Sequence, residues 1–249
     1  MSNNNSVALI TGAAQRIGAE IARQLHTGGY DLALHYNNSA SHAETLSTEL
    51  NRLRANSCHC FQADLARSGS PAELAEQVLE HFGKVSVLIN NASSFYPTKA
   101  GQATEKNWDE LMGSNLKGAF FLTEALIETL TSENGSVVNI IDIHGERPLK
   151  NYTIYGMAKA GLAMMTKSMA RELAPAVRVN GVSPGAILWP DQDEGELDNE
   201  IKQSILARIP MKRPGEPADI AKTVVFLCRD APYITGQIIA VDGGRLLNT

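Results

Sequence analysis

Residues 7–18 read VALITGAAQRIG, an apolar run followed at once by a glycine-containing turn and the start of a helical pattern. Such a turn brings backbone N–H groups and the positive end of a helix dipole close to an anion, so it can bind a pyrophosphate. The turn lacks the middle glycine of a GxGxxG-like pattern, and Arg16 occupies the comparable place. A strand, a glycine turn and a helix also occur as ordinary packing, so the rest of the chain must decide between the two.

Apolar runs of strand length alternate with helical patterns along nearly the whole chain, as in 40–54 and 71–82. We expect seven strands, at Val7–Thr11, Asp31–Tyr36, Cys58–Gln62, Val85–Asn90, Ser136–Ile141, Arg178–Val182 and Gln237–Val241. This alternation predicts an α/β fold with a doubly wound, seven-stranded parallel sheet (Rossmann-type) in a single domain over residues 1–249. The acidic, weakly periodic segment 187–200 is expected to be either a substrate-covering loop or a solvated surface insertion.

Composition excludes several classes of protein. The net charge of −5, without a basic block, predicts that the protein binds no nucleic acid. No apolar stretch approaches the roughly 20 residues of a membrane helix, and residues 1–6 do not resemble a signal peptide, so we expect a soluble cytoplasmic protein that binds no membrane. Three cysteines, Cys58, Cys60 and Cys228, argue against a disulfide framework and are expected to be buried thiols. No cluster of His, Cys, Asp and Glu has metal-ligand spacing, so we expect no metal.

The end of the second strand indicates which dinucleotide fits. An NAD-preferring site usually places Asp or Glu there to bind the ribose hydroxyls, whereas this strand ends His35-Tyr36-Asn37-Asn38-Ser39. A carboxylate would repel a 2′-phosphate, but Ser39, the asparagines and Arg16 can form hydrogen bonds with it. This pattern favours NADPH; the alternative is that these residues form only a polar turn.

Tyr155 and Lys159 are four residues apart in the helical stretch 152–173, so they share a helix face. A lysine ammonium about 4 Å from the phenol, at an effective dielectric constant of about 20, contributes roughly 4 kcal/mol. We therefore expect Lys159 to lower the pKa of Tyr155 by up to about three units, toward the range that suits a general acid.

Further motifs occur in order: Asp64-Leu65, Asn90-Asn91-Ala92, Asn115, Tyr155 with Lys159, and Pro184-Gly185. Together with the turn at 11–18, they resemble the short-chain dehydrogenase/reductase family over essentially the whole chain. The resemblance implies that Asn115 joins the lysine in a water-linked proton relay, and that Asn91 and Ala92 line the path from adenosine to nicotinamide. The implied cofactor-binding residues are Gly12, Arg16, Ile17, Gly18, His35, Tyr36, Asn37, Asn38, Ser39, Asp64, Leu65, Asn91, Ala92, Ser93, Tyr155, Lys159, Pro184 and Gly185.

Asp142 departs from the family pattern, which usually has Ser at this position to donate a hydrogen bond to the substrate carbonyl. A carboxylate is a poor stabiliser of an oxyanion, so ordinary ketone reduction is disfavoured. It is suited instead to accept a hydrogen bond from, or pass a proton toward, a nitrogen heterocycle. The alternative is that Asp142 caps a helix or forms a turn.

The pteridine reductases show the same replacement, and they are similar to this chain at the TGxxxRxG turn, at NNASSFYP (90–97), at His35-Tyr36 and at YTIYGMAK (152–159). The resemblance implies NADPH-dependent hydride transfer to a dihydropterin, or to dihydrofolate, with Asp142, Tyr155, Lys159 and Asn115 as catalytic residues. Phe95 would stack on the pterin, and Arg16, Ser93, Asp142 and Tyr155 would form hydrogen bonds with it. Phe95 as a plain loop anchor is the alternative.

The same resemblance implies a homotetramer, with Val241–Gly244 near a subunit contact. One residue departs from the subgroup, because the kinetoplastid enzymes carry a basic residue where this chain has Asn38, which weakens the expected hold on a 2′-phosphate. Two other functions remain open: a carbonyl or 3-oxoacyl-thioester reductase of the same fold, and a non-catalytic regulator that senses NADPH.

Overall fold

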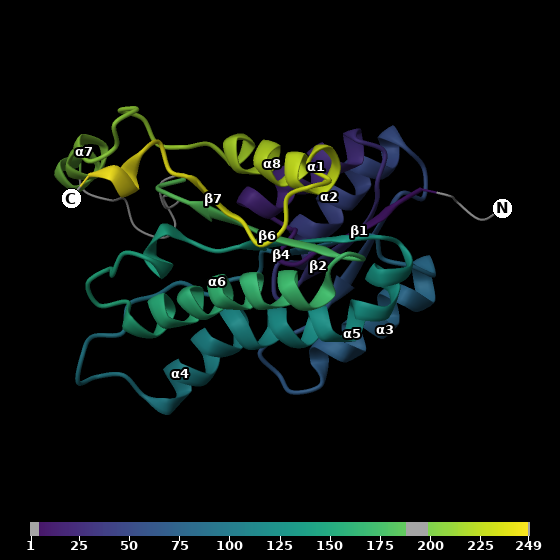
Figure 1. Cartoon of the computed structure of the whole chain (residues 1–249), viewed down its shortest axis with the longest axis horizontal. Coiled ribbons are helices and arrows are strands. Elements are labelled where there is room, and N and C mark those ends of the chain that lie inside the picture. Colours follow the sequence, from purple (N-terminus) through teal and green to yellow (C-terminus); the bar gives the residue numbers. More distant parts are fainter. Residues whose placement is uncertain (1–4, 188–198, 249) are drawn as a thin grey trace.

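The computed structural model describes residues 5–187 and 199–248. Its centre is one seven-stranded parallel sheet, as the sequence predicted (Figure 1). The structure adds the order of the strands in the sheet, which is β3-β2-β1-β4-β5-β6-β7. The strands are β1 (Val7–Ile10), β2 (Asp31–Tyr36), β3 (Cys58–Gln62), β4 (Val87–Asn90), β5 (Ser136–Ile140), β6 (Arg178–Pro184) and β7 (Ile238–Val241). β6 runs two residues beyond its predicted end, because Ser183 and Pro184 pair with Ala240 and Val241 of β7.

Helices cover both faces of the sheet (Figure 1). One layer contains α1 (Arg16–Thr27), α2 (Ala40–Leu53) and α8 (Pro217–Val225), and the other contains α3 (Ser70–Phe82), α5 (Gly118–Ser132) and α6 (Thr153–Leu173). α4 (Glu105–Met112) joins α5 through a π-helical turn, η1 (Gly113–Lys117). Another π-helical turn, η4 (Phe226–Asp230), follows α8, and two short 3₁₀ turns are η2 (Ile143–Gly145) and η5 (Arg245–Leu247).

The sheet separates two apolar cores. Along β1, Ala8 and Ile10 face the core under α1 and α8, whereas Leu9 faces the core under α3 and α5. A parallel sheet buried on both faces needs apolar side chains at successive positions, which explains why β1 is apolar throughout. Each fully buried Leu or Ile contributes about 1.5–3 kcal/mol to the stability of this arrangement.

One buried polar chain crosses the second core near the carboxyl ends of the central strands. Asn90 of β4 donates from Nδ2 to Asn139 Oδ1 at 2.8 Å, and Asn139 donates to Thr166 Oγ1 of α6 at 2.8 Å. Both asparagines are nearly or fully buried, and they are register partners across β4 and β5. Any slip of these strands would leave buried amides unpaired, so the pair favours a single register beside the loops that follow β4 and β5.

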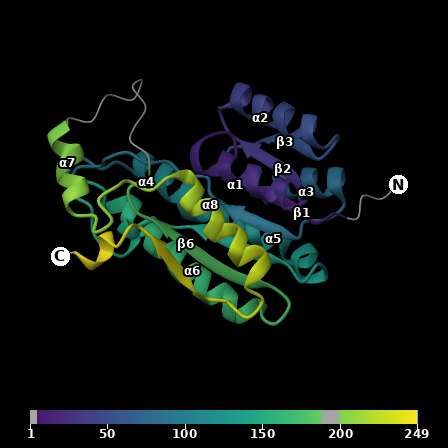
Figure 2. The same cartoon turned by 90° about the horizontal axis from the view of Figure 1, so that it is seen from above.

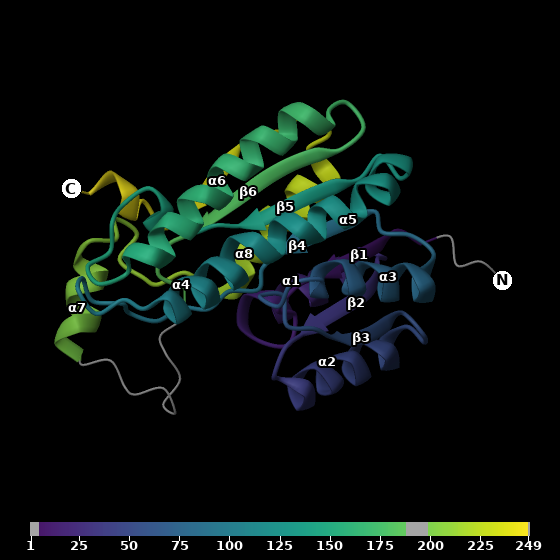
Figure 3. The same ribbon diagram turned by 90° about the horizontal axis from the view of Figure 1, so that it is seen from below.

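All seven strands point the same way, so the loops after them lie along one edge. The chain order reverses between β1 and β4, which is the place where an open α/β sheet forms a crevice for ligands. α4, α7 (Asn199–Ala207) and the C-terminal end lie at the opposite end of the molecule from the N-terminal end (Figures 2 and 3).

Most of the segment 187–200, predicted to be a loop, lies outside the described residues; Ile187, at its start, bridges to Gly215. No helix in residues 5–187 and 199–248 has the length and apolar character needed to cross a membrane.

Candidate active site

The turn between β1 and α1 is shaped for an anion. Gly12 has φ +61°, a left-handed conformation that favours glycine. A Cβ atom on Gly18 would overlap the carbonyl oxygen of Gly12 and lie 2.7 Å from Asn91 Nδ2, so only glycine fits there. The N-cap residue Gln15 makes no side-chain capping bond, and the first turn of α1 contains no acidic residue. An uncapped helix start beside a glycine cradle fits the pyrophosphate of a dinucleotide.

Arg16 has φ +53°, also in the left-handed region, where a residue with a Cβ atom is strained. The conformation explains why a glycine-rich pattern would place glycine here, and it costs an ordinary L residue about 1–2 kcal/mol. The side chain is exposed at the start of α1, at the mouth of the turn. Strain of this kind is concentrated at functional sites.

Thr11 connects the first turn to the loop after β4. Its hydroxyl oxygen accepts from the backbone N–H groups of Asn91 and Ala92, both at 2.9 Å, and the hydroxyl donates to Ile89 O at 3.3 Å. Asn91 in turn donates from Nδ2 to the carbonyl oxygens of Thr11 and Gly12 at 2.9 and 3.0 Å. The loops after β1 and β4 are therefore held together at the point where the chain order reverses.

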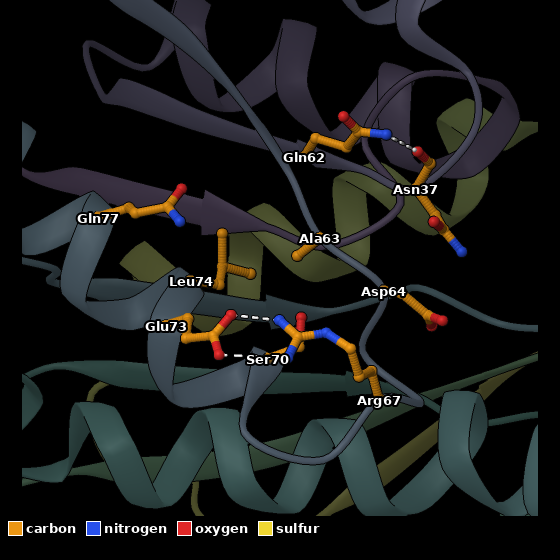
Figure 4. A pocket seen from close by; sticks show the side chains of 9 residues that line it. All are labelled: Asn37, Gln62, Ala63, Asp64, Arg67, Ser70, Glu73, Leu74 and Gln77. Atoms are coloured by element: carbon orange, nitrogen blue, oxygen red, sulfur yellow. Dashed lines mark hydrogen bonds and ion pairs between the residues drawn. The ribbon is translucent and has the colours of Figure 1, made fainter.

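The ends of β2 and β3 supply the other predicted cofactor residues. Asn37 and Asn38 are exposed, Tyr36 and Ser39 are half-buried, and Leu65 is buried. A hollow of about 250 Å³ lies beside them (Figure 4). Its lining residues are Asn37, Gln62, Ala63, Asp64, Arg67, Ser70, Glu73, Leu74 and Gln77. Within it, Arg67 is paired with Glu73.

His35 differs from its neighbours, because it lies beneath the turn rather than beside it. The ring is only 2% exposed, and both ring nitrogens are bonded to backbone atoms of Gly12 and Ala63. At the other side of the site, Gly185 follows Pro184, the last residue of β6. A Cβ atom on Gly185 would lie 2.7 Å from Asp242 Cα, so glycine is needed for this close approach.

Asp142, Tyr155 and Lys159 come together after β5 and at the start of α6. The Tyr155 hydroxyl donates to Asp142 Oδ2 at 2.7 Å, and the backbone N–H of His144 donates to Asp142 Oδ1 at 2.8 Å. Asp142 therefore caps the short turn η2, as the alternative interpretation expected, and it also accepts a hydrogen bond from Tyr155. Its role toward a substrate stays a prediction. Lys159 is 2% exposed and donates from Nζ to Ile140 O at 3.0 Å.

The expected effect of Lys159 on Tyr155 is wrong in this arrangement. Burial, the larger cause, and the adjacent Asp142 carboxylate raise the pKa of Tyr155, while the Ser93 hydroxyl lowers it by less. Lys159 lies 5.6 Å from the centre of the Tyr155 ring, and burial lowers the pKa of this lysine itself to about 8. The cost of burying a phenolate beside the Asp142 carboxylate therefore outweighs the attraction to Lys159 that the simple Coulomb argument considered.

Asn115 lies in the π-helical turn η1, which packs against α6. Its Nδ2 donates to Leu111 O and to Ser94 O, both at 2.9 Å, so it ties the loop after β4 to this turn. Such π-helical insertions frequently occur at functional sites. The position of Asn115 is consistent with a role in the site, while the proton relay itself stays a prediction.

Aromatic rings form one wall of the site. Phe95 is 54% exposed, and its ring stacks on Tyr152 with centroids 4.5 Å apart and an interplanar angle of 17°. The same ring meets Tyr155 edge-on at 4.9 Å. Phe95 is therefore held by the start of α6 and still exposes apolar surface beside the Tyr155 hydroxyl. Ser93, two residues earlier, is exposed.

Three residues near the site were missed in the sequence. Thr11 could have been found because it begins the TG turn, and Tyr152 because it precedes Tyr155 by three residues and so shares its helix face. Arg245 could not, because only the fold brings η5 near Asp142. Burial lowers the pKa of Arg245, and the Asp142 carboxylate partly offsets that effect.

This fold and this site define an oxidoreductase of the Rossmann type. A family model described as enoyl-(acyl carrier protein) reductase matches residues 12–245, and the chain belongs to the short-chain dehydrogenase/reductase family.

Individual relatives carry two kinds of name. Pteridine reductase 1 of Leishmania tarentolae is 37% identical over 282 residues, covering 97% of this chain and 96% of that protein. A 3-oxoacyl-(acyl-carrier-protein) reductase FabG of Staphylococcus epidermidis is 37% identical over 246 residues, covering 98% of this chain and all (100%) of the relative. A putative ketoacyl reductase of the granaticin polyketide synthase of Streptomyces violaceoruber is 33% identical and covers 97% of this chain and 96% of its own length.

Replacing Lys159 tests its lowered pKa. From pH 8, near its folded pKa, to about 10.5, its unfolded value, the unfolded chain binds a proton that the folded chain does not, so stability rises with pH. Relative to Lys159→Met, we expect the wild-type free energy of unfolding to increase by about 2 kcal/mol between pH 7.5 and 9.5, measured by urea titration. A difference that stays constant with pH would contradict the lowered pKa.

Replacing Arg16 with glycine should relieve its backbone strain. After allowing for the greater freedom of glycine in the unfolded chain, we expect Arg16→Gly to raise the free energy of unfolding by about 0.5–1 kcal/mol. Asn134→Gly is the matched control, because Asn134 has φ +50° and asparagine tolerates this conformation, so its gain should be smaller. Urea titration measures both, and a loss of stability in Arg16→Gly would contradict the strain argument.

Proposed function

We propose that this protein is an NADPH-dependent pteridine reductase, which transfers hydride to a dihydropterin, or to dihydrofolate, and gives the tetrahydro form. The observation that carries the proposal is the 2.7 Å hydrogen bond from the Tyr155 hydroxyl to the Asp142 carboxylate. It means that a carboxylate, rather than a hydroxyl donor, faces the position where the substrate must meet the tyrosine.

The chemistry of this pair selects the substrate. Tyr155 has one hydroxyl proton, and Asp142 holds it, so the proton is free for a substrate only when Asp142 accepts another donor. A heterocycle with an N–H beside a ring nitrogen lone pair supplies both partners, since the N–H binds Asp142 and the lone pair accepts from Tyr155. A ketone has no such donor, and its oxygen would face the carboxylate as negative charge develops.

The surrounding residues support a flat, polar heterocycle. Phe95 offers an exposed ring next to Tyr155, and aromatic rings stack well on planar heterocycles. Arg16 and Ser93 are exposed on the neighbouring loops and carry donors suited to oxygen and nitrogen atoms of a pterin. The strained backbone of Arg16 fits a side chain retained for binding rather than for stability.

NADPH would supply the hydride when bound. The glycine cradle of Gly12 and Gly18 and the uncapped start of α1 fit the pyrophosphate. No acidic residue lies at the end of β2, and the exposed Asn37 and Asn38 can form hydrogen bonds with a 2′-phosphate. On the protein side, Tyr155 gives a proton to the substrate nitrogen. Buried Lys159 is a candidate to replace that proton through water, and Asn115 would help to hold the water in that relay.

Two other functions compete with this one. A 3-oxoacyl-thioester reductase is favoured by relatives of equal identity that carry that name, but Asp142 disfavours an oxyanion. A regulator that binds NADPH without turnover is disfavoured by the buried, closely placed Tyr155 and Lys159.

We also propose that the protein assembles as a homotetramer. Large apolar side chains are exposed on the adjacent helices α4, α5 and α6, among them Trp108, Phe121 and Met164 at 45%, 49% and 62%. A hollow of about 440 Å³ with Trp108 and Met157 in its lining lies between α4 and α6. Exposed apolar surface of this kind is typical of a subunit contact, and a second copy of the same helix face is the occupant proposed. The subunit contact that the sequence analysis placed near Val241–Gly244 lies at the end of β7, which is an edge strand of the sheet.

Turnover tests the proposed substrate. Purified protein with NADPH should reduce dihydrobiopterin or dihydrofolate, and Tyr155→Phe should lower kcat/KM by at least about 100-fold because it removes the donated proton. Asp142→Ser restores the residue usual in the family, so it should reduce pterin turnover and increase turnover of an acetoacetyl thioester. NADPH oxidation, with NADH in parallel, is followed by absorbance.

Several results would contradict the proposal. Reduction of the thioester alone by the wild-type protein would favour the carbonyl reductase, and tight NADPH binding without any turnover would favour the regulator. Pterin reduction that survives Asp142→Ser unchanged would remove the argument from the carboxylate.

Light scattering tests the assembly. We expect a wild-type mass of four subunits, and smaller species for Phe121→Glu or Met164→Glu, because a buried unpaired charge opposes association. Leu53→Glu is the control, since Leu53 is 74% exposed on α2, in the other helix layer, and should leave the mass unchanged. A monomeric wild type, or a tetramer that survives both substitutions, would contradict this prediction.

A further inference from the structure

One buried imidazole touches two of the loops that would hold the cofactor. The backbone N–H of Gly12 donates to His35 Nδ1 at 3.1 Å, and His35 Nε2 lies 3.0 Å from the carbonyl oxygen of Ala63. The backbone carbonyl of His35 also accepts from Ala13 N at 2.9 Å. Residue 35, at the end of β2, thus binds the turn after β1 and the chain just beyond β3.

These partners determine the protonation state of the ring. A backbone N–H can only donate, so Nδ1 must be unprotonated, and a carbonyl can only accept, so Nε2 must carry the hydrogen. The ring is therefore the neutral Nε2–H tautomer. A proton on Nδ1 would point at the Gly12 N–H, two donors would face each other, and the bond to the turn would be lost.

The surroundings keep the ring neutral. His35 is 2% exposed, and burial lowers its pKa to about 4, against smaller opposing effects of the Ala63 carbonyl and the nearby Asp64 carboxylate. Across the whole physiological pH range the bond to Gly12 therefore persists.

The bond has a consequence for the anion site. The N–H groups of Gly12 and Ala13 are both taken up by residue 35, so they are not available to a phosphate. The pyrophosphate must then be bound by groups further along, at the uncapped start of α1. The position of that helix start relative to β1 depends on the left-handed turn at Gly12, which His35 holds from below.

We propose that His35 is a positioning residue for the dinucleotide, which does not touch the cofactor with its ring nitrogens but holds the Gly12 turn in its binding conformation and couples it to the Ala63–Asp64 segment. The inference rests on the nicotinamide cofactor of the proposed function and not on the identity of the reduced substrate. In this proposal the ring contacts the backbone of the turn, and other residues contact the phosphates.

Three substitutions separate the two bonds. His35→Leu removes both, His35→Asn keeps an acceptor near the place of Nδ1 for Gly12, and His35→Gln reaches toward Ala63 only. We expect His35→Leu and His35→Gln to weaken NADPH binding by about 10-fold to 100-fold, and His35→Asn by about threefold or less. The dissociation constant is measured by calorimetry with the full chain, with NADH in parallel, so no pterin turnover is needed.

His26 provides a matched control. It is also buried, 5% exposed, with Nε2 2.7 Å from Ser57 Oγ, but it lies at the end of α1 away from the turn. His26→Leu should lower the melting temperature as His35→Leu does and leave NADPH affinity unchanged. The kcat that the folded His35 variants reach at saturating NADPH should change less than their KM for NADPH.

A pH series adds an independent measurement. Because the folded pKa is lowered, the stability that depends on neutral His35 is complete above about pH 6.5 and is lost as pH falls toward 4. The free energy of unfolding of the wild type, relative to that of His35→Asn, should therefore fall as the pH is lowered from about 6.5 toward 4.

Equal NADPH affinity in wild type and His35→Leu, or equal weakening in His26→Leu, would overturn the proposal. A wild type that binds NADPH but reduces no pterin would contradict the proposed substrate and leave the role of His35 standing.

Discussion

The parallel direction of all seven strands is the constraint on which the rest of this structure depends. It gathers the loops after β1, β2, β3, β4, β5 and β6 along one edge, so residues from position 12 to position 185 can meet one ligand. Within that edge, Gly18 packs so closely on Gly12 and Asn91 that no side chain fits. This close packing leaves the start of α1 open to an anion, and every other part of the site is arranged around it.

The end of the candidate site that follows β5 is organised by a carboxylate. Asp142 accepts from Tyr155 and from the backbone of His144, so it shapes the turn after β5 and also controls the tyrosine proton. Lys159 does not pair with the phenol but donates to Ile140 O from a fully buried position. Under the proposed function, the pair Asp142 and Tyr155 suits a substrate that donates and accepts hydrogen bonds at neighbouring atoms.

Much of the fold could be predicted from the sequence, as could the place of many candidate site residues in it. Strand ends were right to within one or two residues, because fully buried parallel strands are apolar at successive positions. Each of the predicted site residues Gly12, Asp64, Asn91, Asp142, Tyr155 and Gly185 follows a strand of the sheet or lies at the start of α6, and their role in binding or catalysis stays a prediction. The direction of the Tyr155 pKa shift could not be predicted. It depends on how deeply the phenol is buried and on which oxygen atom its hydroxyl faces, and the spacing of four residues between Tyr155 and Lys159 contains neither piece of information.

The sequence by itself determined the succession of strands and helices along the chain, the glycine turn and the unusual carboxylate, because these depend on residue type and local spacing. Only the tertiary structure decided that His35 holds the Gly12 turn from below, that Phe95 stacks on Tyr152, and that Arg245 approaches Asp142. Those contacts join segments far apart in the chain or depend on side-chain direction, and burial and hydrogen-bond geometry exist only after the sheet has formed.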